Sequence, residues 1–278
     1  MTRYALDPST PVLSRPDGTV QVGWNPRRAV VVHPPPGLGT PVLVELLRAL
    51  QSAATVPELE AVAAGRGADA AVVPALVDHL AGSGVLTAAP RHRSTAVSIR
   101  LHGNGPLADL LTAALRHSNV RISHTSRSHV STVTADLAVL TDYLVADPRV
   151  VRDLHEANVP HLTVRVRDGA GLVGPLVIPG VTSCLRCADL HRSDRDAAWP
   201  AVAAQLCQTV GTADRATVMA TAALALREVD HVIRAVQADT DPRSWPSPPA
   251  TLDTTLEFDV TTGSTVARRW SRHPHCSC

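Results

Sequence analysis

The sequence contains no lysine, so all 26 of its basic residues are arginine. This absence removes the ammonium group with which many nucleotide sites meet a β- or γ-phosphate. Aromatic residues make up only 3% of the chain, against 45% hydrophobic residues, so its cores must be aliphatic. No apolar run approaches the roughly 20 residues that span a bilayer.

A formal net charge of +1 gives no electrostatic case for nucleic acid or an acidic membrane. No apolar signal segment follows Met1, and we expect a soluble, cytoplasmic protein.

Cysteines are also few, but four of the five stand in two close pairs, Cys184 with Cys187 and Cys276 with Cys278. Two such pairs supply the four thiolates that tetrahedral Zn²⁺ prefers, at Zn–S distances of about 2.3 Å. The gap between the pairs, 276 − 187 = 89 positions, is far longer than in a zinc finger. A shared ion would therefore tie the C-terminus to the middle of the chain. Four thiolates leave no open position to activate water, so the predicted zinc is structural.

Other interpretations of these cysteines stay open. A disulfide needs an oxidising compartment, for which the opening residues give no sign. A thioredoxin-like redox pair at Cys184 and Cys187 leaves Cys276 and Cys278 without a purpose. His273 or His275 could replace one cysteine as a ligand. The four-cysteine zinc site is the favoured interpretation.

A length of 278 residues suggests two domains. In the first part, apolar runs at 12–14, 19–24 and 29–33 predict strands, and Pro16-Asp17-Gly18 predicts a turn between the first two. Three helices should follow: one from an N-cap at Thr40, one from the capping box Thr55–Glu58, and one over 72–80. This order predicts a winged-helix-like module over residues 1–86, with a linker at 87–94.

The rest of the chain, residues 95–278, alternates strands with helices. Predicted strands at 96–101, 120–123, 137–141 and 160–166 imply right-handed crossovers and a largely parallel sheet, as in a Rossmann-type domain. An Ala/Leu/Val-rich helix is predicted over 212–236. A hairpin of 252–260 and 266–270 then delivers the cysteine tail. The predicted fold class is α/β.

A loop with the pattern Gly103-x-Gly105-x-x-Ala108 lies between a predicted strand and helix, as a dinucleotide fingerprint requires. Pro106, however, removes one N–H that would face a phosphate. No acidic residue closes the next strand, where His124 and Thr125 stand instead. The pattern favours a structural tight turn, and we expect no bound nucleotide.

No residue is assigned a catalytic role. Cys207 could be a thioester-forming nucleophile, but a lone cysteine in an Ala/Leu-rich stretch is more often simply buried.

The N-terminal module could bind DNA or a peptide. Its third helix offers Asp78 and His79 but no row of arginines, which disfavours DNA. An edge strand beside an apolar helix can accept an extended peptide by strand addition. The predicted edge is Ala29, Val30, Val31 and Val32, and the facing helix positions are Val73, Leu76, Val77 and Leu80. Those helix positions are equally well explained as the module's own core.

The order of these motifs resembles a known family. A small module precedes the Gly103–Ala108 loop, Gly174-Pro175-x-x-x-Pro179-Gly180 leads into C-x-x-C, and the chain ends His-Pro-x-Cys-x-Cys. This arrangement is similar to the ThiF-like cyclodehydratase partner proteins of azol(in)e-peptide (TOMM, bacteriocin) biosynthesis, over essentially the whole chain.

The resemblance implies an N-terminal module that captures the leader of a ribosomal precursor peptide. It implies a domain like that of ubiquitin-activating enzymes, with zinc on Cys184, Cys187, Cys276 and Cys278. A separate or fused YcaO-type enzyme would use ATP to cyclise Cys, Ser or Thr side chains. This chain, without a YcaO portion, would be the non-catalytic partner subunit, and ThiF-like folds often form homodimers. The alternatives are an ATP-dependent adenylating enzyme of the ThiF type and a winged-helix DNA-binding regulator.

Overall fold

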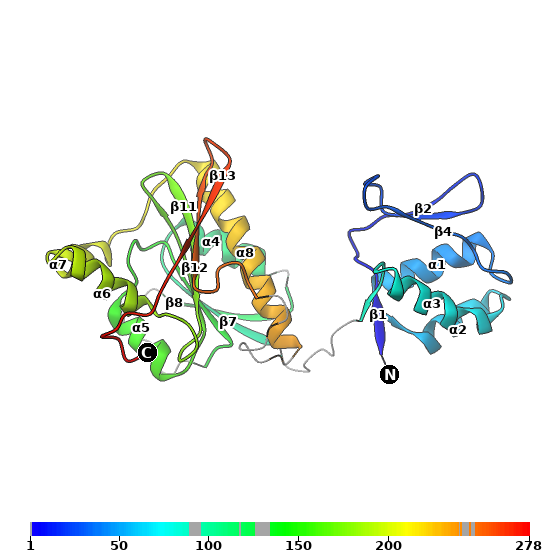
Figure 1. Ribbon diagram of the computed structural model, residues 1–278, viewed down its shortest axis with the longest axis horizontal. Helices are drawn as coiled ribbons and strands as arrows, with labels where there is room; N and C mark the ends of the chain where they lie inside the picture. The colour runs from blue at the N-terminus through cyan, green and yellow to red at the C-terminus, as the bar shows by residue number, and fades with distance from the viewer. Residues whose placement is uncertain are drawn as a thin grey trace. The chain divides into compact units, whose positions relative to one another are not determined.

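The computed structural model describes residues 2–88, 96–116, 118–125, 134–238, 240, 245 and 248–278. The chain divides into two compact units, residues 1–91 and 92–278 (Figure 1). Most of the predicted linker, at 89–94, lies outside the described residues.

The first unit contains two three-stranded antiparallel sheets and three helices. One sheet has the strand order β2 (Val12–Ser14), β3 (Val20–Val22), β4 (Val30–Val32). The other has the order β5 (Ala54–Thr55), β1 (Arg3–Ala5), β6 (Thr87–Ala88). The helices are α1 (Thr40–Gln51), α2 (Val56–Gly65) and α3 (Val73–Gly82), with a 3-10 turn, η1 (Ala70–Val72), before α3. The second sheet was not predicted because β5 and β6 have only two residues each and Arg3–Ala5 is not an apolar run.

Helix starts in this unit follow local chemistry. The capping box is confirmed: Glu58 accepts the Thr55 N–H at 2.7 Å, and the Thr55 hydroxyl accepts the Glu58 N–H at 3.4 Å. The N-cap predicted at Thr40 is wrong, because Gly39 takes that position. Thr40 is the first helical residue, and its hydroxyl donates to the Gly18 carbonyl at 2.6 Å instead.

The second unit is built on a seven-stranded sheet with the order β13-β12-β11-β10-β9-β7-β8. Its four predicted strands are confirmed and mutually parallel: β7 (Val97–His102), β8 (Val120–Thr125), β9 (Leu137–Thr141) and β10 (His161–Arg167). Three antiparallel strands extend it: β11 (Ala170–Val177), β12 (Thr254–Asp259) and β13 (Ser264–Arg269). The hairpin β12–β13 was predicted.

Strand β11 was missed because Gly174-Pro175 looks like a break. In the structure, Gly174 has φ +96, and a Cβ there would meet the Thr254 carbonyl of the neighbouring strand. Glycine thus allows β11 and β12 to approach closely at this point.

Helices cover both faces of this sheet (Figure 1). On one face, α4 (Pro106–Leu115) packs on β7 and β8, and α8 (Arg215–Gln237) packs on β10, in a core that includes Leu162, Val164 and Val166. On the other lie α5 (Pro148–Glu156) and α6 (Leu185–Arg195), followed by α7 (Trp199–Leu206). Alternate residues of a strand point to opposite faces. The polar residues His161, Thr163 and Arg165 therefore face the α5–α6 side.

Candidate functional site

The two cysteine pairs meet in the second unit. Cys184 is the N-cap of α6 and Cys187 lies in its first turn, while Cys276 and Cys278 belong to the tail after β13. The sulfur–sulfur distances are 3.7 Å for Cys184–Cys187, 3.6 Å for Cys184–Cys276 and 3.4 Å for Cys187–Cys278. All four sulfurs lie within 4.8 Å of one another. The structure thus brings together the four cysteines predicted as ligands.

These distances fit a metal ion. Four sulfurs at about 2.3 Å from a tetrahedral centre lie roughly 3.8 Å apart. A disulfide would need about 2.05 Å. The four cysteines can therefore hold a metal ion as thiolates.

The surroundings of the four cysteines disfavour thiolates unless a bound cation compensates their charge. Cys184 and Cys187 are buried in an apolar cluster of sheet and α5 residues. Burial raises the pKa of the Cys184 and Cys278 thiols. Burial also opposes ionisation of Cys187, but the backbone N–H groups of His273 and Cys184 outweigh it and lower its pKa to about 7. A bound cation would stabilise the thiolates and so offset the cost of ionising Cys184 and Cys278.

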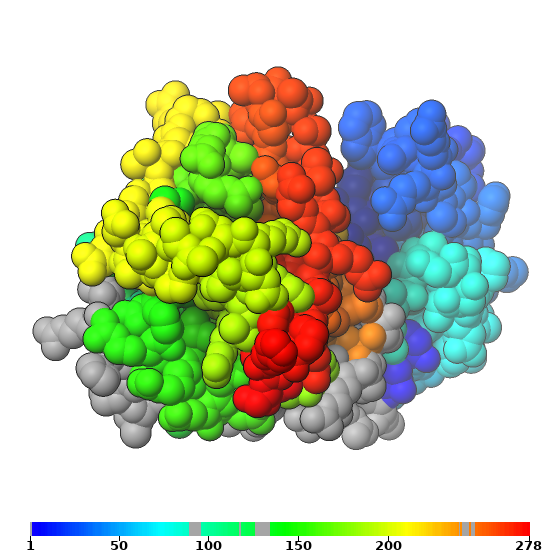
Figure 2. Space-filling view, turned by 60° about the vertical axis from the view of Figure 1, so that its left-hand side comes forward, coloured from blue at the N-terminus to red at the C-terminus, as the bar shows by residue number. Residues whose placement is uncertain are grey.

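The tail has anchors besides its sulfurs. The Trp270 N–H donates to the Asp253 carbonyl at 2.8 Å, and its indole donates to the Thr255 hydroxyl at 2.9 Å. The Arg272 guanidinium donates to the carbonyls of Gly180 and Val181, at 3.1 and 2.9 Å. Figure 2 shows the red tail lying against the yellow-green surface of α6. These bonds hold the start of the tail in place, so that Cys276 and Cys278 reach α6.

A second cluster, His191, Asp194 and His273, lies beside the sulfurs. His273 Nε2 is 2.7 Å from Asp194 Oδ2, and His273 Nδ1 accepts the His275 N–H at 3.1 Å. Because Nδ1 accepts, the ring proton is on Nε2 and points at the carboxylate. Both ring nitrogens of His273 thus have partners. The bond from His273 to Asp194 joins the tail to α6, and we call this contact the latch.

The loop between β7 and α4 is filled by the protein itself. Asp142, which follows β9, accepts the N–H of Leu107 at 2.9 Å and of Ala108 at 3.2 Å. A Cβ on Gly103 would collide with Thr141, and one on Gly105 would lie 2.8 Å from Asp142 Oδ1. These glycines are therefore required by the approach of Thr141 and Asp142.

Sequence reasoning missed Asp142. It is 1% exposed, and burial raises the pKa of its carboxyl despite the hydroxyl of Thr141 and two N–H groups that donate to it. An acidic residue directly after a buried strand was the available signal. The positive end of α4, where a phosphate would bind in a dinucleotide fold, already holds a carboxylate.

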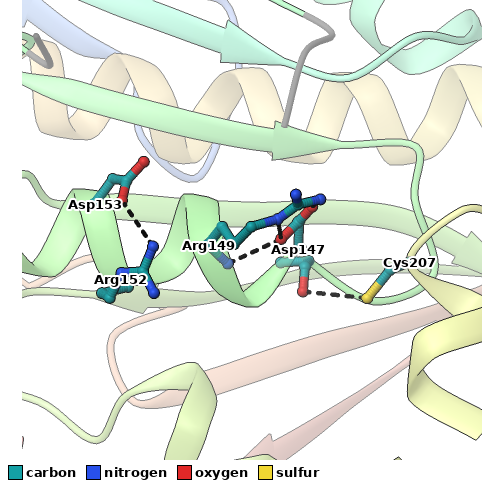
Figure 3. Close-up of polar contacts among 6 residues, drawn as sticks. Asp147, Arg149, Arg152, Asp153 and Cys207 are labelled. Carbon is teal, nitrogen blue, oxygen red and sulfur yellow. Dashed lines mark hydrogen bonds and ion pairs between the residues drawn. The ribbon is translucent and has the colours of Figure 1, made fainter. Parts of the chain in front are cut away.

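Cys207 follows the last residue of α7, and its thiol points to the segment before α5 (Figure 3), where it donates to the Ala146 carbonyl at 3.6 Å. Burial raises its pKa to about 11. A thiol with a raised pKa is a poor nucleophile. In the same view, the Arg149 side chain folds back onto Asp147.

The predicted peptide-binding residues fall into two groups. Val30, Val31 and Val32 form β4, an end strand of its sheet, and Ala29 precedes it. The helix positions are all in the core of the first unit, at most 9% exposed: Val73, Leu76, Val77 and Leu80. Thus β4 is an end strand of its sheet, whereas the helix side chains pack within the unit.

Among the helices of the described ranges, none is long and apolar enough to cross a membrane.

No protein-family profile and no curated protein sequence matches the chain. Solved structures do match. The heterocyclase TruD is 18% identical with a TM-score of 0.66, over 100% of this chain and 42% of TruD. A heterocyclase in complex with substrate and cofactor is 16% identical with a TM-score of 0.65, over 100% and 39%. E. coli MccB with ATP is 12% identical with a TM-score of 0.55, over 99% of both chains.

At these identities the similarity shows a shared fold, that of TruD and MccB. The chain spans about two fifths of the two heterocyclases and nearly the full length of MccB.

Proposed function

We propose that this protein is a non-catalytic adaptor that binds the leader of a ribosomal precursor peptide and presents it to a YcaO-type cyclodehydratase. Its fold is shared with heterocyclases and with MccB, which has been seen in complex with N-formylated MccA. Holding the peptide near the partner enzyme raises its effective concentration there, into the millimolar range for a short tether.

The observation that carries the non-catalytic part is the Asp142 carboxylate at the start of α4. Its bonds to Leu107 and Ala108 use the amides that would otherwise receive a phosphate. A nucleotide bound there would have to displace a buried carboxylate of the same charge sign. The absence of lysine from the whole sequence points the same way.

The peptide-binding part rests on β4. Within the described residues, β4 pairs only with β3, so its other edge is open to strand addition. Gln21 of β3 pairs with Leu13 of β2 on one side and with Val31 of β4 on the other, so the three side chains point to the same face of the sheet. This is the outer face, because Leu13 and Val31 are 42% and 41% exposed. Trp24, just after β3, is 78% exposed. An added strand would pack its side chains beside Val31 on this face.

The metal in this proposal is zinc, held by Cys184, Cys187, Cys276 and Cys278. Four thiolates close the tetrahedral shell, as in structural zinc sites. Its role is to fix the tail on α6, and it takes no part in chemistry.

An adenylating enzyme of the ThiF type is the second candidate. The match to MccB with ATP over 99% of both chains favours it. The two candidates differ in one measurable property, the use of ATP by the isolated chain.

Two assays on the full-length protein test the proposal. A labelled leader from a precursor gene beside this one should bind in fluorescence anisotropy. Val31→Glu should weaken binding about tenfold, or about 1.4 kcal/mol. Val266→Glu is the matched control, since Val266 is 48% exposed on the end strand β13; it should leave binding unchanged. Equal effects of both substitutions would remove β4 from the proposal.

The second assay is ATP–pyrophosphate exchange with MgATP and the precursor peptide. The adaptor proposal expects none. Clear exchange by the isolated protein would replace it with the adenylating alternative, whatever the leader-binding result.

A further inference from the structure

A cavity of about 720 Å³ lies in the second unit, on the α5–α6 side of the sheet. It is lined by the carboxyl ends of parallel strands, by the start of α5 and by α7, represented by Thr141, Pro148 and Trp199. Such crevices at strand ends are where α/β sheets bind ligands. Neither leader binding nor the metal uses this cavity.

Arg165 lines the cavity from β10. It is 8% exposed, yet within the part of the chain that the structure describes no hydrogen bond or ion pair reaches its guanidinium. Burial lowers its pKa to about 10, so the group is still charged at neutral pH. None of the Arg165 nitrogens is both fully buried and unsatisfied, so the guanidinium opens onto the cavity, where an anion can reach it. An anion bound there would form charge-assisted hydrogen bonds with it.

The other charged groups on the cavity wall already have partners. Asp147 binds the Arg149 guanidinium at 2.8 Å. Asp189 accepts from the Arg192 guanidinium at 3.0 Å and from the Trp199 indole at 3.1 Å. Of the charged residues described around the cavity, Arg165 alone is left to meet a ligand. The cavity is therefore matched to a single negative charge.

A phosphate fits this wall less well than a carboxylate. Asp147 and Asp189 are paired with Arg149 and Arg192, which leaves the single charge of Arg165, so a dianion would keep one negative charge uncompensated. The start of α4 is capped by Asp142 and the start of α5 by Asp147. At the start of α7, which has no side-chain cap, the Trp199 N–H donates to the Asp196 carbonyl and Pro200 has no N–H. A monocarboxylate matches the single charge of Arg165 and can form two parallel hydrogen bonds with its guanidinium.

Apolar groups make up much of the remaining wall: Leu140, Val145, Ala146, Pro148, Pro200 and Ala203. They would cover an aliphatic or aromatic body attached to the carboxylate.

We propose that this cavity binds a small organic monocarboxylate, with its carboxylate on Arg165 and its apolar body against Trp199 and α7. The carboxylate can belong to a free acid or to the end of a short peptide. The site is independent of the adaptor function proposed above, since it shares no residue with β4.

The test uses the full-length protein and isothermal calorimetry with 4-methylpentanoate. Its neutral analogue 4-methylpentanamide has the same body without the charge. The acid should bind at millimolar concentration or below, and the amide at least tenfold more weakly. Acetyl-Gly-Leu with a free or an amidated C-terminus shows whether a peptide end is accepted as well as a free acid. Inorganic phosphate should bind more weakly than the acid.

Arg165→Met keeps much of the side-chain length and removes the charge. It should abolish the preference for acid over amide. It should also raise the melting temperature of the ligand-free protein, because an unpaired buried charge is gone. Arg167→Met is the matched control two residues along β10, where the arginine is paired with Glu257 at 3.5 Å; it should keep the preference.

Failure of the acid to bind, equal binding of acid and amide, or phosphate binding as tight as the acid would each overturn the proposal. So would acid binding that survives Arg165→Met, or a lower melting temperature in that variant, which would make Arg165 structural. The acid–amide comparison on the unaltered protein decides even if Arg165→Met does not fold.

Discussion

The carboxylate of Asp142 accepts the backbone N–H of Leu107 at 2.9 Å, although the two residues are 35 positions apart. The same carboxylate accepts the next amide, that of Ala108, at 3.2 Å. One side chain from the end of β9 therefore caps α4. The bond joins the end of β9 to the helix that follows β7, its parallel neighbour. In a nucleotide-binding fold, this end of the helix binds a phosphate.

Replacing this cap should destabilise the second unit. Asp142→Ala leaves two buried amides without an acceptor, and we expect a loss of about 1–3 kcal/mol in the free energy of unfolding. Asp142→Asn keeps one acceptor oxygen in a similar shape and should lose less. Urea unfolding of both variants gives the comparison. Equal stability of Asp142→Ala and the unaltered protein would show that the cap contributes nothing.

The sequence pattern around Gly103 predicted the tight turn but not its occupant. Glycine spacing reports that something approaches closely, whereas Asp142 reaches the loop only through the pairing of β7 with β9. The four cysteines could be predicted as one site because thiolate chemistry allows few other uses. Helix α6 could not, since only Leu185, Cys187 and Ala188 on it are buried, too few for a helical period.

The polar row on β10 was also missed. His161, Thr163 and Arg165 alternate with Leu162, Val164 and Val166, a pattern that usually means a solvent-facing side. Here helices cover that side, so all three polar residues are buried. Only the tertiary structure shows that Arg165 lines a cavity.

The zinc content of the purified protein should depend on the four predicted cysteine ligands. The purified protein should contain about one zinc per chain, and the double variant Cys184→Ser, Cys187→Ser should contain none. Because metal binding supplies folding free energy, this variant should also melt earlier. Cys207→Ser is the control, since its thiol binds the Ala146 carbonyl away from the cluster, and it should keep its zinc. Metal retained in the double variant would show a different ligand set.

Acid should destabilise the protein partly through His161. Burial lowers the pKa of this imidazole from 6.5 to about 4, and its Nε2 has no hydrogen-bond partner. The folded state thus binds fewer protons than the unfolded state between pH 6.5 and about 4. This contribution to stability is complete above pH 6.5 and falls as the pH drops toward 4, by at most about 3 kcal/mol.

His161→Phe keeps the ring volume and removes the titrating group. The unfolding free energy of the unaltered protein minus that of this variant should decrease from pH 7 to pH 4.5, because only the unaltered protein loses the His161 contribution. Urea unfolding at each pH measures it. Acid release of metal affects both proteins alike and cancels in the difference. A difference that does not change with pH would assign the acid sensitivity to other groups.

Removing the metal should loosen the end of the tail but not the strand that precedes it. The Trp270 amide is bonded to the Asp253 carbonyl at 2.8 Å, and Arg272 holds the carbonyls of Gly180 and Val181. The Cys276 amide is bonded only within the tail, to the His273 carbonyl at 3.0 Å. Beyond His273, the contacts that tie the tail to α6 are those of its sulfurs with Cys184 and Cys187.

Hydrogen exchange with and without a chelator should therefore show faster exchange at Cys276 and unchanged protection at Trp270. Asp194→Asn weakens the latch at His273, so in that variant chelation should extend the faster exchange toward Arg272. Loss of protection at Trp270 on chelation of the unaltered protein would instead mean that the ion holds β13 in the sheet.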